Sequence, residues 1–156
     1  MKSLNKRFSI IGGGGFGQEI VSYIYDLYRD ENLEIRVWDN NPDIYLTDIP
    51  EVTFGGSLDN ISVHSSEEVL ICIGDCKIRS RISDFLNSRG INLGKFIHPS
   101  AVISSFAQIE TGCIILPFSC ISTDAFIGCN TVINSHVAVG HHATIGPNSV
   151  ISPQCL

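Results

Sequence analysis

The sequence predicts two structural parts, a small parallel α/β sheet over residues 1–94 and a parallel β-helix over residues 95–156. Two observations predict this division. From Ile97 to Leu156 the chain repeats every six residues, with Ile or Val in the first place and a small residue in the fifth. Residues 8–28 place an apolar run, a glycine-rich loop and a helical apolar pattern in succession. A six-residue period fits neither a lone amphipathic helix nor an alternating strand, and it is typical of coils that cover one another's apolar faces.

Composition indicates a folded chain of 156 residues, with 44% hydrophobic and 17% charged residues. The net charge is −6 and the basic residues form no cluster. Nucleic acid and anionic membranes are therefore excluded as main partners. Any polyanionic ligand must be held by local groups.

The first apolar run is too short and glycine-rich for a signal peptide, and nowhere do 18 apolar residues follow one another. We therefore expect a cytoplasmic protein without a membrane segment. The six cysteines lack the paired spacing of a zinc ribbon, so we interpret them as reduced packing residues and expect no metal.

The first predicted strand, Phe8 to Ile11, runs into a loop that contains five glycines. Such a loop lets backbone amides approach a phosphate, and the following helix adds its partial positive charge. The alternative is a tight strand-to-helix turn with no ligand. The candidate loop residues are Gly12, Gly13, Gly14, Gly15, Phe16 and Gly17.

A second strand, Ile35 to Trp38, ends in Asp39 and Asn40, about 22 residues beyond the glycine loop. Nucleotide-binding folds place a ribose-binding acid near this distance. Asp39 is therefore a candidate contact for a nucleoside. The alternative is a plain Asp-Asn turn before Pro42.

Further along, residues 52–54 form a short extended piece, and Val69 to Ile73 is a continuous apolar strand typical of a buried parallel sheet. A helix follows, with its apolar stripe on Ile78, Ile82, Phe85 and Leu86 and its end at Gly90. Residues 1–94 as a whole therefore predict a Rossmann-like sheet.

The basic residues at the second strand-to-helix junction are Lys77, Arg79 and Arg81. One or two of them are expected near a phosphate on the first loop, whereas Arg81 is better interpreted as part of the solvated face.

In the repeat half, three hexads make one coil, so the ten hexads predict three and a third coils. Three of the five histidines, His136, His141 and His142, fall within seven residues. Histidine is the usual general base near neutral pH. His98 lies at the entrance to the repeat and is interpreted as a structural turn residue.

The whole order of motifs resembles one family. The matching segments are IIGGGGFGQEI, WDNNP, VTFGGSL, ICIGDCKIRSRI, FIHPSAVIS and NTVINSHVAVGHHATIG. Together they resemble the hexapeptide-repeat sugar acyltransferases related to sialic-acid O-acetyltransferase and to the UDP-4-amino-sugar N-acetyltransferase of bacillosamine synthesis.

The resemblance implies a left-handed β-helix, a homotrimer, and acetyl-CoA bound along the β-helix between subunits. It implies that the first domain binds a UDP-linked or similar amino sugar and that acetyl moves to its amino or hydroxyl group. His141 matches the general base. His142, the next residue, is the second candidate catalytic residue, because it can orient His141 through a hydrogen bond. The implied substrate contacts are Gly12 to Gly17, Asp39, Asn40, Gly74, Lys77 and Asn134.

Two departures from the family stand out. The residue after the base is usually Asp or Glu, and here it is His142, which supplies no negative charge. The chain also stops at a hexad boundary where relatives continue, Val150 stands where a second histidine is common, and Leu156 is expected to leave an uncapped coil.

Two alternatives therefore remain beside the enzyme. One is a trimeric nucleotide-sugar-binding module whose acetyl-CoA site is incomplete. The other is a β-helical metalloenzyme using His136 and His141, whose third ligand would fall at Ser100 and not at His98.

Overall fold

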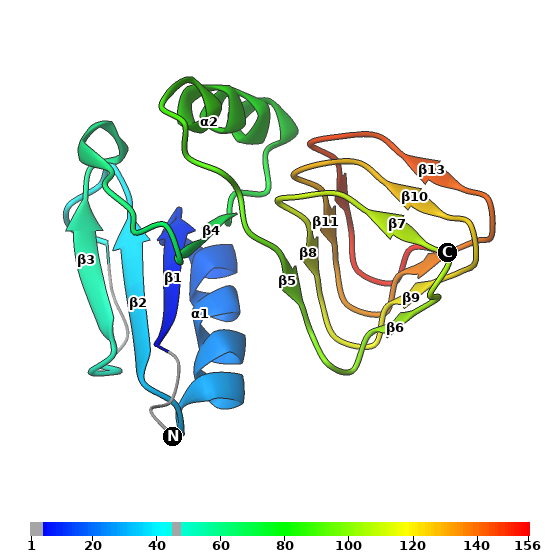
Figure 1. The fold of residues 1–156 in the computed structure, drawn as a ribbon, viewed down its shortest axis with the longest axis horizontal. Helices are drawn as coiled ribbons and strands as arrows, with labels where there is room; N and C mark the ends of the chain where they lie inside the picture. Colours follow the sequence, from blue (N-terminus) through cyan, green and yellow to red (C-terminus); the bar gives the residue numbers. More distant parts are fainter. Residues whose placement is uncertain (1–4, 45–47) are drawn as a thin grey trace. The chain divides into compact units, whose positions relative to one another are not determined.

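A computed structural model describes residues 5–44 and 48–156. The chain divides into two compact units, Met1–Ile73 and Gly74–Leu156 (Figure 1). The boundary expected between residues 94 and 95 lies two residues before the first hexad, which begins at Ile97. The helix that precedes the hexads lies in the second unit.

The first unit is built on a parallel four-stranded sheet of order β3-β2-β1-β4. Helix α1 covers Gly15–Tyr28 and buries Ile20, Val21 and Ile24, the apolar stripe that the sequence predicts. The strands are β1 (Lys6–Ile11), β2 (Leu33–Trp38), β3 (Val52–Gly56) and β4 (Glu68–Ile71), and a short 3₁₀ turn, η1, covers Leu58–Asn60.

One buried carboxylate ties three strands of this sheet together. Glu67, with a side-chain exposure of 2%, accepts hydrogen bonds from Ser9 Oγ at 2.5 Å and from Arg36 Nη2 at 2.5 Å. The backbone N–H of His64 adds a third, and Trp38 Nε1 donates to Ser9 Oγ at 2.9 Å. Burial alone would raise the pKa of Glu67, but the hydrogen bonds from Ser9, His64 and Arg36 outweigh it and hold that pKa below its ordinary value.

The glycines of the loop between β1 and α1 fall into two groups. Gly12 has φ +95°, and a Cβ on Gly17 would lie 1.9 Å from the carbonyl oxygen of Gly12. A Cβ on Gly13 would meet Ile44 Cδ1 at 2.7 Å. These three positions therefore require glycine for packing. A Cβ on Gly14 or Gly15 would have no neighbour within 4 Å.

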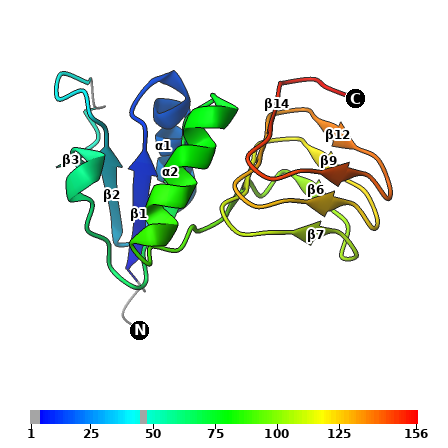
Figure 2. The same ribbon diagram turned by 90° about the horizontal axis from the view of Figure 1, so that it is seen from above.

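The second unit contains helix α2 (Cys76–Ser88) and a coil of ten two-residue strands in three parallel sheets (Figure 2). The sheets have the orders β5-β8-β11-β14, β6-β9-β12 and β7-β10-β13. Val132 of β11 pairs with Val150 of β14, 18 residues on, so each coil contains three hexads, as expected. The strands are β5 (Phe96–Ile97), β6 (Val102–Ile103), β7 (Gln108–Ile109), β8 (Ile114–Ile115), β9 (Cys120–Ile121), β10 (Phe126–Ile127), β11 (Val132–Ile133), β12 (Ala138–Val139), β13 (Thr144–Ile145) and β14 (Val150–Ile151).

First-place and fifth-place residues fill the interior of this coil. Ile121 and Ile133 from the first place pack with Cys113, Ala125 and Val137 from the fifth place in one buried cluster. The small fifth-place side chains leave room for the chain to turn. The parallel sheets and the hexads fit a left-handed parallel β-helix.

Each corner from residue 112 onward turns at the fourth place of a hexad, where φ is positive. The backbone N–H of this residue donates to the preceding coil, as from His142 to Thr123 O at 3.1 Å and from Asn148 to Cys129 O at 2.9 Å. The positive-φ corner residues are Gly112, Phe118, Asp124, Asn130, His136, His142, Asn148 and Gln154.

Arg79 of α2 is fully buried, and its guanidinium donates to Asn130 O at 2.7 Å and to Asn130 Oδ1 at 2.6 Å. Asn130 Nδ2 in turn donates to Asn148 Oδ1 at 2.7 Å. The expectation that Arg79 is available to a phosphate is therefore wrong, and Ile78, assigned to the apolar stripe, is 45% exposed. The reason is that the buried oxygens of a corner need donors, which a guanidinium supplies.

Replacing Arg79 with leucine should lower the free energy of unfolding by about 2–4 kcal/mol, because it leaves the oxygens of Asn130 buried without these donors. Arg81→Leu, two residues along the same helix at an exposed position, should change it by less than about 0.5 kcal/mol. Urea denaturation of both variants measures the difference. Equal stability of the two would contradict the anchoring role of Arg79.

A paired substitution tests the two groups of loop glycines. Gly17→Ala should destabilise the chain by about 3 kcal/mol or more, because the new Cβ collides with backbone that cannot move aside. Gly15→Ala should change the free energy of unfolding by less than about 0.5 kcal/mol, because its Cβ enters open space. Thermal unfolding followed by circular dichroism compares them. A Gly17→Ala variant as stable as Gly15→Ala would show that the loop is not packed as described.

Candidate active site

The corner between β12 and β13 carries both predicted catalytic histidines. His141 occupies the third place of its hexad and His142 the fourth, where φ is +59°. Both side chains are exposed, and their rings meet edge to face with centroids 5.2 Å apart and an interplanar angle of 84°. The corner thus presents two imidazoles that lie against each other.

An acidic side chain that the sequence interpretation did not include lies beside this pair. Asp124 Oδ2 is 3.8 Å from His142 Nδ1, and it accepts a hydrogen bond from Thr123 Oγ1 at 3.3 Å. Asp124 lies 18 residues before His142, one coil earlier. The sequence could have revealed it, because residues 18 apart occupy the same place in successive coils. Asp124 and His142 both occupy the fourth place of a hexad.

The neighbouring corner contains Asn134 and His136, and their side chains make contacts within the fold. Asn134 Nδ2 donates to Ile151 O at 2.8 Å, in the next coil. The ring of His136 stacks on Phe118, with centroids 5.1 Å apart. The contacts of both side chains are therefore with other parts of the coil.

His98 lies in a turn, as expected. Ser100 N donates to His98 Nδ1 at 3.2 Å, and Ser100 Oγ lies 2.8 Å from the same nitrogen. Burial lowers the pKa of His98, in agreement with an imidazole nitrogen that accepts these contacts. Ser100 Oγ also accepts from Phe118 N. Over residues 5–44 and 48–156, no group of three His, Cys, Asp or Glu side chains is placed to hold a metal ion.

In the first unit the structure brings Asp39 and the glycine loop together, as the sequence predicts. Asp39 Oδ2 accepts a hydrogen bond from Gly13 N at 2.9 Å, and Oδ1 accepts one from Asn41 N at 2.9 Å. Asn40 Oδ1 instead accepts from Ser57 Oγ and Leu58 N, so it fixes the turn after β3. Phe16 is half-buried, and Gly14 and Gly15 are exposed at the start of α1.

Gly74 and Lys77 are exposed at the start of α2, in the second unit. Asp75 caps this helix, because its Oδ1 accepts from Ile78 N at 2.9 Å. The Lys77 side chain therefore lies in the first turn of a well-capped helix.

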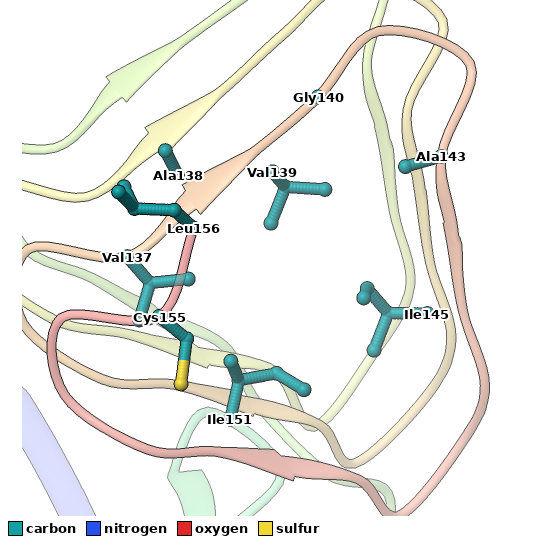
Figure 3. A pocket seen from close by; sticks show the side chains of 9 residues that line it. All are labelled: Val137, Ala138, Val139, Gly140, Ala143, Ile145, Ile151, Cys155 and Leu156. Atoms are coloured by element: carbon teal, nitrogen blue, oxygen red, sulfur yellow. The ribbon is translucent and has the colours of Figure 1, made fainter.

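The last coil lines an open apolar pocket of about 290 Å³ (Figure 3). Val139, Ile145 and Ile151 point into it from the three faces of the coil, and Leu156 lies at its edge (Figure 3). Its lining carries no charged or strongly hydrogen-bonding side chain. The pocket is a continuation of the β-helix interior and cannot perform the chemistry of the histidine corner.

None of the helices in the described part of the chain has the length and apolar character needed to cross a membrane. Residues 124–156 match the family model described as bacterial transferase hexapeptide (six repeats). This match covers the histidine corner and its flanking coils.

Known proteins resemble the chain over most of its length. GDP-perosamine N-acetyltransferase of Escherichia coli O157:H7 is 26% identical over 131 residues, which cover 78% of this chain and 56% of that protein. The chain thus spans a little over half the length of this relative.

Among solved structures, the acetyltransferase domain of PglB from Neisseria gonorrhoeae FA1090 has a TM-score of 0.81 at 22% identity, covering 96% of this chain and 72% of that one. The same domain in complex with acetyl coenzyme A gives a TM-score of 0.57 at 23% identity, covering 94% and 67%. The chain therefore carries a bacterial transferase hexapeptide segment and shares its fold with an acetyltransferase domain.

Proposed function

We propose that the chain transfers an acetyl group from acetyl-CoA to the amine of a nucleotide-linked sugar. The observation that carries the proposal is the exposed pair of His141 and His142 on a corner of a hexapeptide β-helix. The name of the Escherichia coli relative, a GDP-linked sugar N-acetyltransferase, supports the acceptor. The similar domain in complex with acetyl coenzyme A supports the donor.

His141 acts as the general base in this proposal. Its neutral imidazole takes a proton from the sugar amine as the amine nitrogen attacks the thioester carbonyl. The carbon–sulfur bond then breaks, and the imidazolium returns the proton to the departing thiolate of coenzyme A. The amide product and free coenzyme A account for every atom and charge.

The nucleotide sugar binds, in our proposal, at the glycine loop and Asp39. The first backbone N–H groups of α1 have no partner within the helix and lie at its positive end. Because Gly14 and Gly15 carry no Cβ and are exposed, a phosphate oxygen can approach these groups closely. Asp39 is already hydrogen-bonded to the loop, which places a carboxylate beside it for the nucleoside.

Four further residues are proposed as ligand contacts, each within its own unit: Asn40 in the first, and Gly74, Lys77 and Asn134 in the second. Asn40 contributes by fixing the turn next to Asp39. Lys77 supplies a positive charge, and Asn134 is held at the corner before β12 by the hydrogen bond from its Nδ2 to Ile151 O.

We also propose that the chain forms a homotrimer through the outer face of the sheet β6-β9-β12. Val102 of β6 is 66% exposed, and Cys120 and Ala138 occupy the equivalent outward positions on β9 and β12. Phe106 and Phe118, at the adjoining corners, are 70% and 62% exposed. Exposed apolar side chains on this face and at the corners on either side of it favour burial against another copy of the chain.

Replacing His141 with asparagine should lower kcat about 10²- to 10⁴-fold, because asparagine cannot accept the amine proton. Release of the coenzyme A thiol, measured with UDP- and GDP-linked amino sugars, provides the assay. His64→Asn is the matched control. The ring of His64 is exposed and only its backbone N–H joins the Glu67 network, so activity should stay within about twofold of wild type.

Full activity of the His141→Asn variant on every accepted sugar would contradict the assignment of the base. Calorimetry distinguishes the enzyme from the alternative, a binding module. Binding of a nucleotide sugar without any binding of acetyl-CoA to the wild-type chain would favour the module over the enzyme.

Val102→Glu should dissociate the trimer, because it places a carboxylate on the proposed apolar interface. Light scattering after gel filtration should give three times the 17.0 kDa chain mass for the wild type and a single chain for the variant. Gln108→Glu makes a matched change at the same hexad place on β7 and should leave the mass unchanged. A trimer that tolerates Val102→Glu would assign the interface to another face.

A further inference from the structure

A chain of buried hydrogen bonds joins Glu67 to the indole of Trp38 in the first unit. Trp38 Nε1 donates to Ser9 Oγ at 2.9 Å, and Ser9 Oγ donates to Glu67 Oε1 at 2.5 Å. Ser9 and Trp38 are buried, and the side chain of Glu67 is only 2% exposed. Water therefore competes little for these bonds, and removal of any member leaves a buried polar group without its partner.

The charge on Glu67 fixes the direction of both bonds. Burial raises the pKa of this carboxyl group, but the hydrogen bonds from Ser9, His64 N and Arg36 outweigh burial and hold the pKa below its ordinary value. Glu67 is therefore a carboxylate at neutral pH and can only accept. Because the single hydroxyl proton of Ser9 is donated to this carboxylate, the Ser9 oxygen is left to accept from Trp38.

Trp38 lies where the pairing of β2 with β3 is irregular. The register shifts between Val37 and Trp38, so that Trp38 pairs with Gly56. Irregularities of this kind re-aim the side chains beside them. A Cβ on Gly55 would lie 2.7 Å from Cδ2 and Cε2 of the indole, so glycine at this position leaves room for the ring. The indole, packed on Gly55 and bonded to Ser9, therefore fixes how β2 ends.

The residue after this indole is Asp39, which contacts the glycine loop. Trp38 O accepts a hydrogen bond from Gly12 N at 2.9 Å. Asp39 Oδ2 accepts one from Gly13 N, also at 2.9 Å, and Asp39 N donates to Gly56 O at 3.1 Å. The end of β2 thus holds the first two glycines of the loop through one hydrogen bond each. A rotation of the chain at Trp38 would move the Asp39 carboxylate away from Gly13.

We propose that Ser9 and Glu67 are positioning residues for the nucleotide site, which act through the indole of Trp38. Their hydrogen bonds orient the indole, and the indole sets the Asp39 carboxylate against the glycine loop before any ligand binds. This inference rests on the proposed binding of the nucleotide sugar at that loop. An acid and a loop that are already in place need less ordering when the nucleotide binds, so loss of one link should weaken binding.

A double-mutant cycle in the full chain, with UDP and GDP as probes, tests the proposal. Ser9→Ala removes the acceptor of the indole, and Trp38→Phe removes the donor while keeping an aromatic ring. Calorimetry should give each variant a Kd about three- to tenfold higher than that of the wild type. The double variant should bind at most about twofold more weakly than either single variant, because both changes break the same link.

Ile24→Val is the control, because Ile24 is a fully buried apolar residue of α1 in the same unit. It should lower the melting temperature by a few degrees and leave the Kd of both nucleotides within about twofold of wild type. In the acetyl-transfer assay, Ser9→Ala should raise the KM of the nucleotide sugar while kcat and the KM of acetyl-CoA stay within about twofold. A general loss of stability would not produce this split.

Hydrogen exchange at the Gly13 amide, followed by NMR in the free protein, tests the positioning without a ligand. Ser9→Ala and Trp38→Phe should each speed this exchange about three- to tenfold, because the hydrogen bond to Asp39 is then made less often. Ile24→Val should leave the exchange at Gly13 unchanged.

Additive losses of affinity in the double variant, or unchanged exchange at Gly13 in both single variants, would overturn the inference. Equal effects of Ser9→Ala and Ile24→Val on the Kd would overturn it as well. Faster exchange at Gly13 in Ser9→Ala, together with no binding of UDP or GDP by the wild type, would overturn the proposed nucleotide site and not the positioning of Asp39. The two failures are therefore distinguishable.

Discussion

The left-handed corner residue at the fourth place of each hexad from residue 112 onward is the constraint on which the β-helix depends. Seven residues other than glycine adopt it, with φ between +53° and +61°. This conformation costs an L-residue roughly 1–2 kcal/mol. The fold retains it because most of the corner N–H groups donate to a carbonyl of the preceding coil and because the turn directs first-place and fifth-place side chains into one interior. The apolar hexad pattern and the strained corners therefore depend on each other.

Every corner repeats after one coil, so the fourth-place side chains form columns. The kind of side-chain contact differs from one column to the next. Phe118 and His136 stack as aromatic rings. Asn130 and Asn148 share a hydrogen bond and receive Arg79 from α2. In the third column Asp124 faces His142. The interior fixes the register, and the identity of the fourth-place residues decides which contacts each column makes.

The fold was largely predictable from the sequence, because six-residue periodicity and a glycine loop between a strand and a helix are local signals. The observed bounds of β1, β2 and β4 lie close to the apolar runs. Asp124 and the anchoring role of Arg79 were not predictable in the same way. Each depends on a partner that is distant in the sequence, 18 residues away for Asp124 and 51 residues for Arg79. In a single hexad a polar fourth-place residue indicates only a solvated corner, and an arginine in a helix indicates only a solvated face.

The burial of Arg79 also bears on how a chain with a net charge of −6 would hold a polyanion. One of the three basic residues of the second strand-to-helix junction is committed to the interior of its own unit. The glycine loop offers a different means of holding a polyanion. Packing requires Gly12, Gly13 and Gly17, whereas Gly14 and Gly15 have open space where a Cβ would lie. Glycine at these two positions keeps the first amides of α1 accessible, and amides attract a phosphate through fixed dipoles without adding a positive charge. An anion site of this kind is compatible with an acidic chain, because its attraction comes from backbone that the sheet and helix already hold in place.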